Sequence, residues 1–76
     1  MSVKIYPNPS KGLFYIEIQD YRGPVILKIS DSLGKLLETH HLMYSGLMSW
    51  RLEEGLYIIE ISLSNNQIIK QSIVVM

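Results

Sequence analysis

The sequence predicts an all-β domain in which seven strands form an antiparallel sandwich of two sheets. Three observations lead to this fold class. Apolar and polar residues alternate with a period of two, apolar residues at helical spacing are hard to find, and turn signals recur at short intervals. The predicted strands are Val3–Tyr6, Leu13–Ile18, Val25–Ser30, Leu36–His40, Leu47–Leu52, Leu56–Leu63 and Ile68–Val75.

The first two strands are separated by the stretch YPNPSKG, in which one asparagine stands between two prolines. Pro7 and Pro9 have no backbone N–H donor and push Tyr6 and Asn8 toward extended conformations, so neither a helix nor a central strand can continue here. Gly12 follows where the next strand must begin. We therefore predict a rigid corner after a short edge strand, either with no further role or with a role in partner contact.

The later turns support the other strand boundaries. Asp20–Pro24 joins the second strand to the third, and Asp31–Gly34 is predicted to be a type I turn with Gly34 where a positive φ is favoured. Asn65 and Asn66 predict a tight hairpin before the last strand, because asparagine tolerates the left-handed region. No linker or internal repeat interrupts the pattern, so the 76 residues are predicted to form one domain.

Alternation within the strands predicts which side chains form the core. The residues expected to point inward are Phe14, Ile16, Ile18, Val25, Leu27, Ile29, Tyr57, Ile59 and Ile61. Apolar side chains also remain on the outward faces, at Leu13, Tyr15, Ile26, Leu56 and Ile58. These are either scattered over the surface or joined in one docking patch, and both possibilities stay open at this point.

The composition excludes several classes of protein. Lys and Arg number 7 and Asp and Glu number 7, with no run of either sign, so no nucleic-acid partner is expected. No apolar stretch approaches the roughly 20 residues of a membrane-spanning helix, and no signal-peptide core follows Met1. The chain has no cysteine and 47% hydrophobic residues, so its stability must come from apolar packing.

We expect Met1 and Ser2 to be additions to a natural chain that continues upstream of Val3.

No catalytic, cofactor-binding or metal site is predicted. His40 and His41 are adjacent on a strand and therefore point to opposite faces, so we interpret them as two polar residues near a loop. Glu53 and Glu54 are predicted to form a solvated turn before Gly55. The sequence has no nucleophile elbow, phosphate-binding glycine loop or zinc-binding helix motif, so neither enzyme activity nor a small-molecule substrate is expected.

Trp50 is the residue that would favour a different function. On an open surface it would provide a sugar-stacking platform, as in a carbohydrate-binding or adhesion module. Met48, Trp50 and Leu52 share one face of the fifth predicted strand, however, and this pattern is more typical of a core position.

Four blocks of the sequence carry a family resemblance. They read IYPNPSKGLFYIEI, LKISDSLGKLLE, LEEGLYIIEISL and IIKQSIVVM, and they resemble the type A C-terminal sorting domain of the type IX secretion system, also called the Por secretion system sorting domain. The residues that match the motifs of this family are Pro7, Asn8, Pro9, Gly12, Asp31, Gly34, Lys35, Gly55, Tyr57, Lys70, Ile73, Val74 and Val75. The chain departs from the family pattern at Gln71 and Met76, because a second basic residue is common in this region.

The resemblance implies a seven-stranded Ig-like sandwich that acts as a non-catalytic sorting signal. It implies a position at the C-terminus of a cargo protein that crosses the periplasm of a Gram-negative bacterium and passes the outer-membrane translocon, helped by a shuttle protein. The cargo then reaches the cell surface or the medium, and a cysteine-protease-like sortase often removes the domain. We expect the terminal segment Lys70–Met76, on or near a sheet edge, to be read by a partner. A purely structural appendage to a neighbouring domain is a further alternative.

Overall fold

The computed structural model describes residues 2–76, and none of them is helical. Met1, and with it the prediction that Met1 is an addition, lies outside the described residues. Within residues 2–76 no helix is long and apolar enough to cross a membrane. The seven predicted strands are present as β1 (Val3–Tyr6), β2 (Leu13–Ile18), β3 (Gly23–Asp31), β4 (Leu36–Tyr44), β5 (Met48–Arg51), β6 (Gly55–Leu63) and β7 (Ile68–Val75).

The predicted bounds are confirmed for β1, β2 and β7, whereas the other four strands differ in length. The largest difference is in β4, which was predicted to end at His40 and continues to Tyr44. It continues because β3 offers pairing partners up to its end, from Ile29 opposite Glu38 to Gly23 opposite Tyr44, after a register shift beside Leu36. The interpretation of the two histidines as residues near a loop is therefore wrong, since they lie in the middle of a strand.

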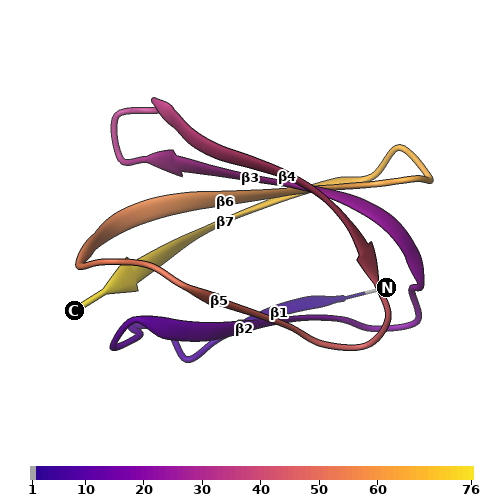
Figure 1. Ribbon diagram of the computed structural model, residues 1–76, viewed down its shortest axis with the longest axis horizontal. Helices are drawn as coiled ribbons and strands as arrows, with labels where there is room; N and C mark the ends of the chain where they lie inside the picture. Colours follow the sequence, from indigo (N-terminus) through magenta and orange to yellow (C-terminus); the bar gives the residue numbers. More distant parts are fainter. Residues whose placement is uncertain (1) are drawn as a thin grey trace.

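The strands form two antiparallel sheets. The smaller sheet has the order β1-β2-β5, and the larger one has the order β4-β3-β6-β7. Figure 1 shows the sheets as two stacked layers, with the start of β1 and the end of β7 toward opposite sides of the view. The architecture confirms the predicted seven-stranded, Ig-like β-sandwich, and it places β7 at an edge of the larger sheet.

The residues predicted to point inward lie in the core between the sheets, with one exception. The core also contains buried residues that the face prediction did not name, which are Ile5, Tyr44, Leu63, Ile73 and Val75. The buried members of the predicted set are Phe14, Ile16, Ile18, Val25, Leu27, Ile29, Ile59 and Ile61. Tyr57 is only partly buried and packs against the margin of this core. Full burial of one such apolar side chain contributes about 1.5–3 kcal/mol relative to exposure. The two sheets are therefore held together by apolar packing, as expected for a small chain without cysteine.

Candidate functional site

The strand register gathers the matched residues of all four blocks, apart from Lys70, at one end of the sandwich. In the larger sheet, Asp31 of β3 pairs with Tyr57 of β6, and Gly55 of β6 pairs with Val75 of β7. The corner Pro7–Gly12 lies beside the last part of β7, to which it is hydrogen-bonded. We call this region the motif end. It is the end of the molecule that carries the C-terminus in Figure 1.

Asn8 connects the corner to the outer edge of β7. Its side-chain amide donates a hydrogen bond to the carbonyl of Ser72 at 3.1 Å, and its side-chain oxygen accepts one from the N–H of Val74 at 3.0 Å. One asparagine side chain thus satisfies two backbone groups that β6 cannot reach. The prolines on either side lack N–H donors, and Pro9 restricts the backbone of Asn8, which precedes it.

Ser10 continues the same connection through its backbone. Its N–H donates to the carbonyl of Val74 and its carbonyl accepts from the N–H of Met76, each at 2.8 Å. These two bonds make a parallel bridge between Ser10 and Val75. We call the segment Asn8–Ser10 the clasp, because it holds the last residues of the chain from the side opposite to β6.

The hydroxyl of Ser10 shapes the corner from inside. Ser10 is 1% exposed, and its hydroxyl donates to the carbonyl of Leu13 at 2.7 Å and accepts from the N–H of Gly12 at 3.0 Å. Gly12 has a φ of +125°, which side chains rarely allow. Sequence reasoning missed Ser10. The available signal was a small polar residue placed between a proline and a glycine in a tight corner.

Asp31, Gly34 and Lys35 form the turn between β3 and β4. One carboxylate oxygen of Asp31 accepts hydrogen bonds from the N–H groups of Leu33 and Lys35, both at 2.9 Å. Gly34 donates to the carbonyl of Asp31 at 3.0 Å and has a φ of +89°, in agreement with the predicted turn. The aspartate and the glycine of this block therefore serve the shape of the hairpin.

Gly55 and Tyr57 form a second structural unit. The ring of Tyr57 lies over Gly55, where a Cβ atom would come within 3.3 Å of the ring atoms. The Tyr57 hydroxyl donates to the carbonyl of Glu53 at 2.8 Å and so closes the preceding turn. Glu53 and Glu54 are exposed in this turn, as predicted. A side chain at Gly55 would therefore force the tyrosine ring to shift by a few tenths of an ångström.

The terminal strand divides into residues that face the core and residues that face outward. Ile73 and Val75 are 0% and 3% exposed, whereas Val74 is 39% exposed. The side chain of Lys70 is 67% exposed, and its ammonium nitrogen lies 3.5 Å from a carboxylate oxygen of Glu60 on the neighbouring strand. Within the matched part of β7, therefore, Lys70 and Val74 expose their side chains to solvent, whereas Ile73 and Val75 are packed in the core.

The two histidines do not meet. His40 is paired with the buried Leu27 and points toward the inner face of β4, where its ring nitrogen lies 2.8 Å from Glu38. His41 is exposed on the opposite face. Residues 2–76 contain no group of three or more histidine, cysteine, aspartate or glutamate residues that could hold a metal ion.

Trp50 occupies the margin of the core. It is paired with the buried Phe14, and its ring meets the His40 ring edge-on with centroids 4.5 Å apart. Met48, Trp50 and Leu52 all pack against the core, which confirms the prediction that they share its face. The arrangement does not favour Trp50 as an open platform for sugar stacking.

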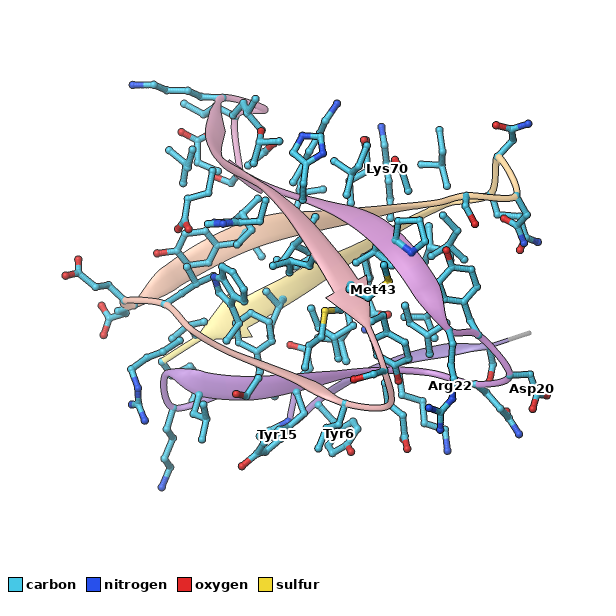
Figure 2. The ribbon with its side chains drawn as sticks, turned by 45° about the vertical axis from the view of Figure 1, so that its right-hand side comes forward. Tyr6, Tyr15, Asp20, Arg22, Met43 and Lys70 are labelled. Atoms are coloured by element: carbon cyan, nitrogen blue, oxygen red, sulfur yellow. The ribbon has the colours of Figure 1, made fainter. Side chains whose placement is uncertain are left out.

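The outward apolar residues do not form one patch. They are divided between the outer faces of the two sheets, with Leu13 and Tyr15 on the smaller sheet and Ile26, Leu56 and Ile58 on the larger sheet. Tyr15 contacts Tyr6, with ring centroids 5.7 Å apart. Figure 2 shows these two tyrosines projecting from one side of the sandwich and Lys70 from the other. A single docking patch made of all five residues is therefore excluded.

Comparison with known proteins provides the family. No curated protein matches the chain. Among models of protein families, the secretion system C-terminal sorting domain matches residues 4–75. This range contains every residue that matches a motif of the family, from Pro7 to Val75. The chain belongs to the family of secretion system C-terminal sorting domains, and it carries a C-terminal sorting signal for type IX secretion.

Proposed function

We propose that residues 1–76 are one module at the C-terminal side of a longer cargo protein, and that the module directs this cargo through the outer-membrane translocon of the type IX system. The partners are the translocon, its shuttle protein and, after passage, a cysteine-protease-like sortase that removes the domain. The cargo is in the periplasm during transit and then reaches the cell surface or the medium. Family membership supports the route.

The observation that carries the proposal is the convergence of the matched residues of all four blocks, apart from Lys70, on the motif end. A partner that contacts this end meets the corner, the terminal strand and two turns at once. Pro7, Pro9, Lys70 and Val74 are exposed there and along β7, and we propose that they contact the partner. Most of the other matched residues support the backbone of this surface. The domain therefore acts as a label, and we propose no catalytic role for it.

The proposal is tested with a fluorescent reporter that is directed to the periplasm and carries this domain at its C-terminus. We expect the reporter on the cell surface or in the medium of a bacterium with an intact type IX system. In an otherwise identical strain without the translocon, we expect the reporter to stay in the periplasm. Periplasmic retention in both strains, with the domain shown to be folded, would contradict the proposed function.

A second prediction concerns Lys70. Lys70→Ala is expected to change the free energy of unfolding by no more than about 0.5 kcal/mol, because the lysine of the 3.5 Å ion pair with Glu60 is 67% exposed. We expect the same substitution to lower export of the reporter several-fold, because it removes the exposed charge on the terminal strand. Lys4→Ala is the matched control, since Lys4 is an exposed lysine of the other sheet. Equal export of both variants and the unchanged domain would exclude Lys70 from recognition.

A further inference from the structure

The outer edge of β7, which faces away from β6, is paired with another segment along only one half of the strand. Antiparallel pairing directs the backbone groups of alternate residues toward β6 and away from it. The hydrogen bonds of the clasp identify Ser72, Val74 and Met76 as residues whose backbone groups are directed away from β6. The same alternation directs those of Ile68 and Lys70 outward in the first half of the strand.

The clasp occupies the second half of this edge. It satisfies the carbonyl of Ser72, both backbone groups of Val74 and the N–H of Met76, so this part of the strand is paired on both sides. Among residues 2–76 no comparable segment pairs with the outward groups of Ile68 and Lys70. The edge there carries the exposed ammonium group of Lys70, and a charged side chain of this kind discourages strand pairing.

The composition of β7 explains why its edge needs protection. The strand Ile68–Val75 contains five β-branched apolar residues, one charge, and neither proline nor glycine. Such segments pair readily with one another when their backbone edge is free. The net charge of the domain is zero, so two copies do not repel each other strongly. The occupant that best fits an open β7 edge is therefore the β7 strand of a second copy, related to the first by a two-fold axis.

We propose that the Asn8–Ser10 clasp prevents the domain from pairing with a second copy of itself through the terminal strand. The inference rests on the proposed function in one respect, since a strand that is paired with another copy would be hidden from the partner that reads it. The closure of the clasp and its effect on self-association do not depend on the route of export.

Asn8→Ala tests the clasp directly, because it removes both side-chain hydrogen bonds to β7. Asn65→Ala is the matched control, since the Asn65 side chain also makes two hydrogen bonds, both to Gln67, at the opposite end of β7. In hydrogen exchange followed by NMR, we expect the Val74 amide of Asn8→Ala to exchange at least about tenfold faster than in the unchanged domain. The amide of Ile61 in the core keeps its rate, and Asn65→Ala leaves the Val74 amide unchanged.

Sedimentation velocity over a range of concentrations tests the consequence. We expect Asn8→Ala to form a dimer at concentrations at which the unchanged domain and Asn65→Ala are monomeric. Unchanged exchange of Val74 would overturn the inference, and so would faster exchange without any dimer, or a dimer of the unchanged domain through β7.

A milder variant covers the possibility that Asn8→Ala does not fold. Asn8→Asp keeps an oxygen to accept from Val74 but cannot donate to Ser72, so we expect a smaller rise in Val74 exchange and a weaker dimer. Wild-type exchange of Val74 together with a monomer at every concentration would overturn the inference here too. The export assay separates the two proposals, because a reporter that stays in the periplasm with the unchanged domain contradicts the proposed function and leaves the exchange and sedimentation results intact.

Discussion

Ile73→Ala is expected to lower the free energy of unfolding by about 2–5 kcal/mol, because it opens a cavity at a fully buried position in β7. Domains have a total stability of about 0.05–0.15 kcal/mol per residue, which amounts to about 4–11 kcal/mol for 76 residues. The substitution thus removes a large part of the total. Thermal unfolding followed by circular dichroism measures the effect, since each kcal/mol corresponds to about 4–8 °C in Tm for a domain of this size.

Val74→Ala is the matched control for this prediction. Val74 is the next residue of the same strand, but it is 39% exposed and faces outward, so we expect a loss below about 1 kcal/mol. Similar stability losses for the two variants would contradict the division of β7 into an inner and an outer face. The pair also sharpens the export assay, because a loss of export in Ile73→Ala reflects unfolding whereas a loss in stable Val74→Ala reflects lost recognition.

Tyr44→Phe is expected to lower the free energy of unfolding by about 1–3 kcal/mol. The Tyr44 hydroxyl accepts a hydrogen bond from the buried N–H of Ile18 at 2.7 Å and donates one to the carbonyl of Gly46. It therefore connects β4 of the larger sheet to the end of β2 in the smaller sheet. Phenylalanine fills the same space but leaves the N–H of Ile18 without a partner in the core, and a buried donor without a partner costs about this amount. Chemical denaturation with both chains measured under the same conditions gives the difference.

Tyr21→Phe is the control for the hydroxyl. The Tyr21 hydroxyl also makes hydrogen bonds, to the carbonyl of Pro24 and to Ser64, but these lie at the surface, where water can replace them. We expect a loss below about 1 kcal/mol for this variant. If Tyr21→Phe proved as costly as Tyr44→Phe, the larger effect at Tyr44 would not come from burial of the N–H of Ile18.

Much of the fold follows from local patterns. The period of two in the strands predicted all seven of them and eight of the thirteen buried apolar residues among residues 2–76, because successive side chains of a strand point to opposite faces. The turn at Asp31–Gly34 was also predicted from the sequence. The Asp31 carboxylate accepts hydrogen bonds from backbone N–H groups only two and four residues away, and Gly34 has the positive φ of the turn. Tyr57 packs against the core but is only partly buried, because its ring lies over Gly55 at the margin of the core.

The extent of β4 and the role of Tyr44 were not visible in this way. The histidine pair interrupts the apolar alternation, so the pattern ended the strand too early. In the structure, β4 continues because it pairs with the long strand β3. His40 points inward, where it contacts Glu38 and Trp50. A strand end that depends on its neighbour in the sheet cannot be read from its own residues.

The sequence by itself determined the strands, the turns, the family and the residues that match its motifs, because these depend on alternation and on short-range backbone chemistry. Only the tertiary structure decided that the outward apolar residues are divided between two surfaces and that Asn8 and Ser10 hold the terminal strand. Asn8 and Val74 are 66 positions apart, and their hydrogen bond exists because the two sheets place the corner after β1 beside the edge of β7. Strand order across two sheets results from packing of the whole chain, and no local pattern specifies it.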